Sequence, residues 1–92
     1  MHTKREKGAL LKRVNRIRGQ VDAIERALTS EKEDCAGVLQ TIAACRGAIN
    51  GLMAEVMEGH MREHVLSPKE KPSEPQREAA EDIIQLINRY LK

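Results

Sequence analysis

Hydrophobic residues recur at alternating intervals of three and four positions along two stretches of this 92-residue chain. The first stretch carries six of them, at Leu10, Val14, Ile17, Val21, Ile24 and Leu28. Such a repeat lines up along one face of an α-helix and leaves the other faces polar. We predict a helix over residues 4–29, which Thr3 and Glu6 open as a reciprocal capping box.

The second stretch repeats the same spacing at Val38, Ile42, Cys45, Ile49, Leu52 and Val56. It predicts a helix over residues 34–65, roughly 48 Å long at the usual rise per residue. The polar connection before it is short, so this helix returns antiparallel to the first. Because the second helix is longer than the first, part of its apolar stripe is left for another subunit.

The rest of the chain predicts a linker and one more helix. Two prolines and alternating charges mark residues 66–73 as the linker. Ser73 and Gln76 then form a capping box for a helix over residues 74–91. With no Trp or Phe, aliphatic side chains must form the core, which is typical of helices packed on helices. We therefore predict one all-α domain of three helices with a thin core.

Apolar runs in the chain are short. None approaches the roughly 18 residues that a membrane-spanning helix needs. The N-terminus is charged from its first residues and does not resemble a secretory signal. We expect a cytoplasmic protein without a membrane partner.

Basic side chains are concentrated at the start of the chain. Residues 1–18 carry seven Lys or Arg side chains against one acidic side chain, a balance of +6, whereas residues 19–92 balance at −4. A solvated helix face and a polyanion-binding surface both explain this asymmetry. Since no aromatic platform for stacking single-stranded bases is present, duplex DNA held through its phosphates is the better-fitting polyanion.

Three side chains have the spacing and placement of metal ligands. His60 and His64 are four residues apart, so both imidazoles lie on one helix face and can reach one ion. Cys35 follows Asp34, a predicted N-cap, and the dipole at a helix start favours the thiolate. Each has an ordinary interpretation too: histidines that share a face by chance, and a thiol buried as a small apolar group. Cys45 falls on the apolar stripe, and we assign it to the core.

These candidates can meet only between two chains. Cys35 and His60 are 25 residues apart, about 38 Å along one helix. If two second helices pack antiparallel about a twofold axis, Cys35 of one chain meets His60 and His64 of the other, and the dimer makes the site twice. His2 and the α-amine of Met1 join them, because the hairpin places the N-terminus beside the end of the second helix of its own chain.

The resulting donor set is rich in nitrogen and has one sulfur. Such a set suits nickel(II) or cobalt(II) in five or six coordination. Copper(I) prefers more thiolate, and structural zinc prefers a closed tetrahedral Cys/His set. We therefore predict a nickel or cobalt site formed by Met1, His2, His60, His64 and Cys35 of the partner subunit.

Three stretches of the sequence resemble the CsoR/RcnR/FrmR family of bacterial repressors. They are Arg16 to Val21, then Cys35 with Val38 to Ala48, and Asn50 to Met53 before His60. The resemblance covers essentially the whole chain and implies an all-α tetramer, a dimer of antiparallel dimers. It also implies that the effector-free protein represses transcription and that effector binding releases the operator DNA.

The sensing positions resemble those of the nickel/cobalt branch, in which a His near the N-terminus is followed by Cys, His and His. His2, Cys35, His60 and His64 match this order. Copper sensors of the family carry a cysteine where this chain has His64. Formaldehyde sensors usually carry proline at the second position, where this chain has His2. A free terminal amine beside Cys35 still allows an aldehyde to be trapped, so a formaldehyde-responsive repressor of a detoxification operon is the alternative prediction. Cys45 departs from the aliphatic residue that the family pattern leads us to expect.

The expected partner is double-stranded operator DNA, contacted through its phosphates. The predicted DNA-binding residues are Lys4, Arg5, Lys7, Lys12, Arg13, Arg16, Arg18 and Arg46. Metal binding pins Met1 and His2 to the end of the second helix in this hypothesis, which reorients the basic helix and weakens its phosphate contacts. An enzyme is not expected, because no general-base constellation stands apart from the metal ligands. A metal carrier would explain the ligands but not the basic helix.

Overall fold

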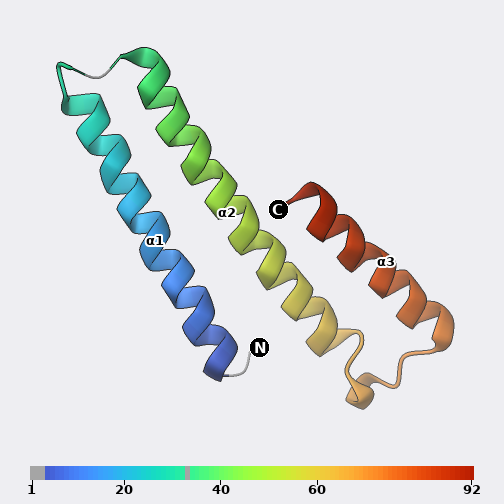
Figure 1. Cartoon of the computed structure of the whole chain (residues 1–92). Coiled ribbons are helices and arrows are strands. Elements are labelled where there is room, and N and C mark those ends of the chain that lie inside the picture. Colours follow the sequence, from blue (N-terminus) through green and yellow to red (C-terminus); the bar gives the residue numbers. More distant parts are fainter. Residues whose placement is uncertain (1–3, 33) are drawn as a thin grey trace.

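The computed structural model describes residues 4–32 and 34–92, and it is all-α as predicted (Figure 1). Helices α1 (Lys4–Thr29) and α2 (Cys35–His64) form an antiparallel hairpin. A short 3-10 helix, η1 (Pro68–Glu70), lies in the connection to α3 (Glu74–Tyr90). Helix α3 runs back beside the C-terminal half of α2. The described residues contain no strand.

The helix boundaries lie within one residue of those predicted from the hydrophobic pattern. The 3-10 helix inside the linker is a feature that the pattern did not indicate. Thr3, the first residue of the predicted N-terminal capping box, lies outside the described residues. No helix of the described part of the chain is long and apolar enough to cross a membrane.

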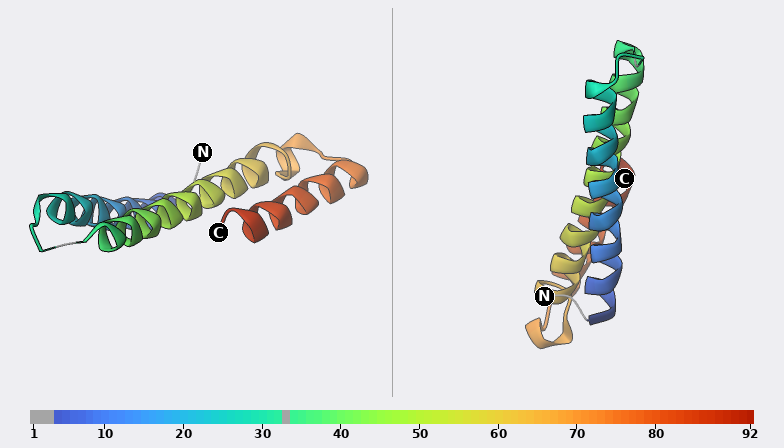
Figure 2. Two further views of the ribbon diagram at one scale, coloured as in Figure 1. Left: turned by 90° about the horizontal axis from the view of Figure 1, so that it is seen from above. Right: turned by 90° about the vertical axis from the view of Figure 1, so that its left-hand side faces the viewer.

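The molecule is long and flat. Its extents are 59 × 26 × 11 Å, and the smallest of these is about the diameter of a single helix. Figure 2 shows the three helices lying close to one layer. A single layer of helices cannot enclose a core, and the largest buried side chains are isoleucines and a leucine on and before α3.

The predicted apolar stripes of α1 and α2 are therefore only partly buried against each other. Cys45 is 5 % exposed, which confirms its assignment to the core. Leu28 and Val21 on α1 remain 67 % and 50 % exposed, and Ile42 and Ile49 on α2 remain exposed as well. The heptad pattern predicts one apolar stripe that faces the hairpin, whereas a single partner helix leaves several residues of that stripe exposed.

Helix α2 is capped where it begins. The Asp34 carboxylate accepts a hydrogen bond from the Gly37 amide at 2.7 Å, which satisfies one of the unpaired amides of the first turn. This cap fixes Cys35 as the first residue of the helix. At the other end, Val65 closes the helix with its amide bonded to the Met61 carbonyl.

Helix α3 is held to α2 by a small apolar cluster and by polar contacts. Leu66, Ala80 and Ile84 are buried together there. The Asn88 amide donates to Glu58 at 2.9 Å, and this hydrogen bond is the main reason that the pKa of the Glu58 carboxyl is lowered. Arg62 pairs with both Glu58 and Glu81, so it joins the last turns of α2 to the middle of α3.

The predicted capping box at the start of α3 is confirmed. The Ser73 hydroxyl accepts from the Gln76 amide at 3.2 Å, and the Gln76 side chain accepts from the Ser73 amide at 2.9 Å. Replacing Ser73 with Ala is expected to lower the free energy of unfolding by about 1 kcal/mol, because one amide of the first turn loses its acceptor. Urea denaturation followed by circular dichroism measures this change. Ser67→Ala is the control, since Ser67 caps only a three-residue turn, and an equal loss in both variants would contradict the prediction.

Candidate functional site

One face of α2 carries an exposed series of residues that runs its whole length. Its members follow one another at intervals of three or four, and each is exposed. They are Cys35, Leu39, Ile42, Arg46, Ile49, Met53, Met57, His60 and His64. We call this series the outer stripe of α2. It is an apolar surface, because the large aliphatic and methionine side chains in it are 40 % to 59 % exposed.

The outer stripe has a candidate metal ligand at each end. Cys35 begins it, in the first turn of α2, and its thiol is exposed. His60 and His64 end it, in the last two turns. A helical repeat of this kind keeps all three on one side of the helix. The hydrophobic spacing along the sequence predicts that Ile42 and Ile49 belong to the stripe that faces α1, and it does not distinguish the outer stripe from that one. The signal in the sequence that indicates the outer stripe is a second series of residues, spaced by three or four, that starts at Cys35.

His60 and His64 lie against each other. Their ring centroids are 4.6 Å apart with an angle of 45° between the ring planes. Both side chains are exposed, so their nitrogen atoms are accessible from the same side of α2. Two imidazoles four residues apart on one helix face can both reach one ion.

Within one chain the structure does not bring Cys35 to the histidines. They stand at opposite ends of a continuous helix, and its rise separates Cys35 from His60 by about 38 Å and from His64 by about 44 Å. No group of three or more Cys, His, Asp or Glu side chains suited to a metal ion occurs among residues 4–32 and 34–92. A complete donor set on the His60 and His64 pair therefore needs a second subunit or the N-terminal residues.

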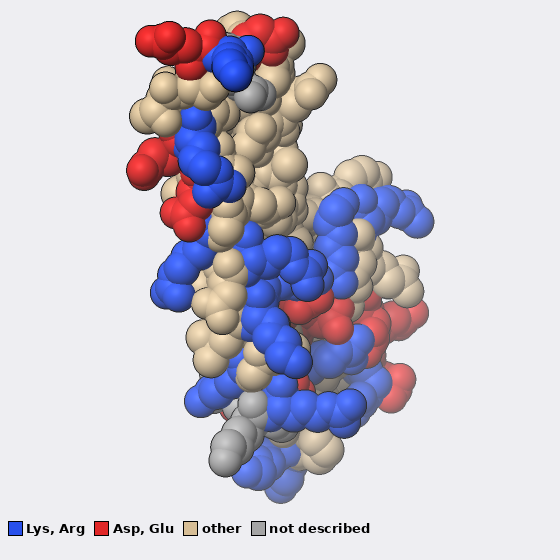
Figure 3. All heavy atoms as spheres, turned by 60° about the vertical axis from the view of Figure 1, so that its left-hand side comes forward, with Lys and Arg blue, Asp and Glu red and all other residues tan. Residues whose placement is uncertain are grey.

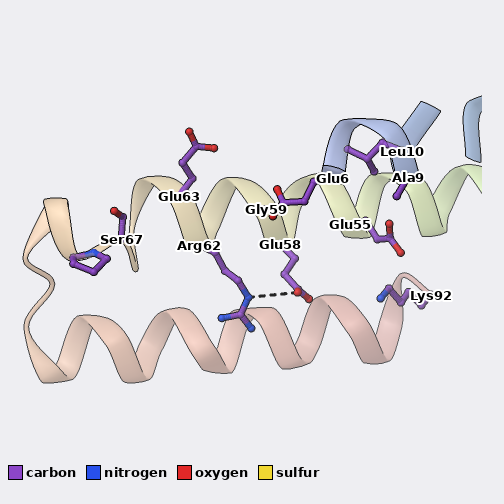
Figure 4. Close-up of a pocket in the computed structure, with 11 residues that line it drawn as sticks. Glu6, Ala9, Leu10, Glu55, Glu58, Gly59, Arg62, Glu63, Ser67 and Lys92 are labelled. Carbon is purple, nitrogen blue, oxygen red and sulfur yellow. Dashed lines mark hydrogen bonds and ion pairs between the residues drawn. The ribbon is translucent and has the colours of Figure 1, made fainter. Parts of the chain in front are cut away.

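The start of α1 does lie beside the end of α2, as the hairpin predicted. A cleft of about 710 Å³ opens between them and the end of α3 (Figure 4). Its walls include Glu6 and Leu10 of α1 together with Gly59 and Arg62 of α2. Two candidate ligands, Met1 and His2, lie outside the described residues.

The basic side chains of α1 are mostly exposed. Arg5, Lys7, Lys12 and Arg16 point to solvent, and Lys4 is the first residue of the helix. Figure 3 shows Lys and Arg side chains gathered over the half of the molecule at which the chain begins.

The remaining three predicted DNA-binding residues have other surroundings. Arg18 is exposed and donates to the Asn15 side chain at 3.1 Å. Arg46 is exposed in the middle of the outer stripe of α2. Arg13 is only about one third exposed, and its guanidinium is paired with Glu55 of α2 at 2.8 Å. The sequence does not indicate this pair, because the two residues are 42 positions apart.

Comparisons with known proteins agree with this architecture. The family described as metal-sensitive transcriptional repressor matches residues 6–89. The transcriptional repressor RcnR of Salmonella paratyphi B is 45 % identical over 92 residues, which cover 99 % of this chain and 98 % of that protein. An uncharacterised protein from the bioA 5′ region of Serratia marcescens is 48 % identical over 91 residues, with the same shares of the two chains.

A solved structure has the same fold. It is a variant of the formaldehyde-responsive regulator FrmR from Salmonella enterica serovar Typhimurium, in which a glutamate is replaced by histidine. The TM-score is 0.68 at 42 % identity, and the match covers all of both chains.

Proposed function

We propose that this chain binds operator DNA and is released from it by nickel(II) or cobalt(II). The chain belongs to the family of metal-sensitive transcriptional repressors. The family consists of repressors rather than enzymes. The observation that carries the choice of effector is the outer stripe of α2, which has a thiol at one end and two adjacent imidazoles at the other. The site of action is the cytoplasm, where operator DNA is found.

Two chains pair through their outer stripes in this proposal. An antiparallel pairing about a twofold axis buries the apolar side chains of both stripes and brings Cys35 of each subunit to the histidines of the other. The flatness of the single chain supports this arrangement, since a one-layer fold buries little apolar surface by itself. The exposed side chains of Ile83, Leu86 and Tyr90 on α3 offer a further apolar surface on which two such dimers assemble into a tetramer.

The proposed ligands are His60, His64, the partner's Cys35, His2 and the α-amine of Met1. The structure supports His60 and His64 by their adjacent rings, and Cys35 by its exposure at the far end of the same face of α2. His2 and the α-amine of Met1 are proposed from the sequence and because the start of α1 and the end of α2 line one cleft. Several nitrogen donors with one thiolate favour nickel(II) or cobalt(II) over copper(I).

The basic start of α1 holds the DNA in this account. Its Lys and Arg side chains, with Arg18 and Arg46 as further contacts, neutralise phosphates of the duplex. Metal binding ties the N-terminus to the end of α2 and so changes the direction of the helix that carries the charge. Phosphate contacts are lost, and the metal-bound protein leaves its operator.

Formaldehyde is the second candidate effector. The specific observation in its favour is the likeness to a structure of a formaldehyde-responsive regulator, together with the exposed Cys35 thiol. A thiol and a primary amine can be joined by the carbon of formaldehyde with loss of one water molecule. The α-amine of Met1 is the amine that this alternative requires.

One titration separates the two effectors. Fluorescence anisotropy of chelator-treated protein bound to DNA from upstream of its own gene is followed as nickel is added stepwise, and a second sample receives formaldehyde. Release at stoichiometric nickel, with formaldehyde inert, is the expected result. Release by formaldehyde alone would replace nickel as the effector, and absence of DNA binding at low salt would contradict the repressor itself.

A further inference from the structure

Arg13 stands out among the basic side chains of α1 because an acidic side chain of the other long helix holds it. Its Nη2 atom donates to Glu55 Oε1 at 2.8 Å, and the two side chains are 32 % and 34 % exposed. Arg5, Lys7, Lys12 and Arg16 are exposed by comparison. One charge of the predicted DNA-binding run is thus neutralised inside the hairpin.

A glycine makes room for this contact. Gly51 of α2 is buried, and a Cβ atom built on it would lie 2.6 Å from Arg13 Nη1. Among the described residues, the atoms of α1 close to that position belong to the guanidinium of Arg13. The guanidinium therefore lies over the bare backbone of α2 at Gly51 and reaches Glu55 one turn further along the helix.

Arg13 is also within reach of the surface that would face DNA. Arg16 follows it by three residues, so the two side chains are neighbours on the surface of α1. A guanidinium binds phosphate and carboxylate in the same geometry, so a phosphate can take the place of Glu55. The Arg13–Glu55 pair is partly exposed, and pairs of that kind contribute little free energy, which makes the exchange feasible.

We propose that Glu55 competes with DNA for Arg13 and thereby sets how tightly the operator is held and how readily effector releases it. The inference rests on the proposed function and adds a regulatory residue to it. Glu55 precedes His60 by five residues on α2 and lines the cleft that the start of α1 shares with the end of α2. DNA favours the state in which Arg13 is free to bind phosphate, and effector that releases the DNA returns Arg13 to Glu55.

The test compares operator affinities by fluorescence anisotropy in Glu55→Gln, Arg13→Gln and the double variant. Glu55→Gln is expected to bind about two- to fivefold more tightly than the parent, the factor that corresponds to a partly exposed ion pair. The nickel concentration for half-release is expected to rise by a similar factor, because the linkage between metal and DNA is reciprocal. Arg13→Gln is expected to bind more weakly and to flatten the salt dependence by about 0.9 in slope, since one phosphate contact is lost.

The double variant decides whether the effect runs through Arg13. In the Arg13→Gln background, Glu55→Gln is expected to leave the affinity unchanged. Gly51→Ala is a second way to free Arg13, because the added methyl group displaces the guanidinium and leaves the carboxylate in place. It is expected to tighten operator binding as well. Glu25→Gln on α1 is the control for loss of one negative charge away from Arg13.

The outcomes separate the inference from the proposed function. A parent protein that binds no DNA overturns both. A parent that binds and is released by metal, with a Glu55→Gln variant that binds no more tightly, overturns the competition alone. The competition is also overturned if Glu55→Gln tightens operator binding equally in the parent and in the Arg13→Gln background, or if Glu25→Gln tightens it as much. The gain in affinity would then come from the loss of one negative charge anywhere on the protein.

Discussion

Replacing Ile49 with Asp is expected to leave the chain monomeric and to weaken operator binding at least about 100-fold, because two desolvated carboxylates would face each other. The proposed pairing places Cys35 beside the partner's His60 and His64. The midpoints of 35 and 60 and of 35 and 64 are 47.5 and 49.5, so the twofold axis passes close to residue 49. The side chain of Ile49 is 46 % exposed in the single chain and would meet its own copy in the dimer.

Sedimentation velocity measures the mass of the variant, and anisotropy measures its affinity for DNA. Ile83→Asp is the matched control, since Ile83 on α3 has the same residue type and the same 46 % exposure but lies off the outer stripe of α2. It is expected to remain at least dimeric. An Ile49→Asp variant that sediments like the parent would show that the outer stripe is not the dimer interface.

Replacing Cys35 with Ala is expected to raise the nickel concentration needed for release at least about 100-fold, since even outer-shell changes at metal sites cost 10- to 100-fold and a thiolate ligand is lost outright. Binding of DNA without metal is expected to stay close to that of the parent. Cys35 is exposed and contributes nothing to the buried core, so the fold has no need of its thiol.

Cys45→Ala is the control for this experiment. It removes a thiol from the same helix, but from the buried side. Its expected effect is a loss of stability with unchanged release by nickel. The site would have to be reassigned if Cys35→Ala released DNA like the parent, or if Cys45→Ala blocked release.

The secondary structure followed from the sequence because its signals are local. Hydrophobic spacing located α1 and α2, and Ser73 with Gln76 marked the start of α3. The adjacency of His60 and His64 followed from a spacing of four residues on a helix. Each of these features depends on residues within one or two helical turns of one another, and periodicity describes such features well.

The features that the sequence did not reveal depend on distant residues. The pair of Arg13 with Glu55 requires that the Arg13 side chain of α1 lies over Gly51 and Glu55 of α2, and no pattern along either helix records how the two helices are aligned. The exposure of Val21, Leu28 and Ile49 depends on how much of a wide apolar stripe one neighbouring helix can cover. Both are properties of packing, which periodicity within one helix does not contain.

The proposed metal site is built from residues of two subunits, and mixing of variant subunits tests this most directly. Cys35→Ala and His64→Ala chains are unfolded, mixed in equal amounts, refolded together and titrated with cobalt(II), and the thiolate-to-cobalt charge-transfer absorption is recorded. Neither variant alone is expected to give the full band. The mixture is expected to recover about a quarter of the parent signal, because half of the dimers are mixed and each restores one of its two sites. No recovery on mixing, with the band intact in the parent, would contradict a site shared between subunits.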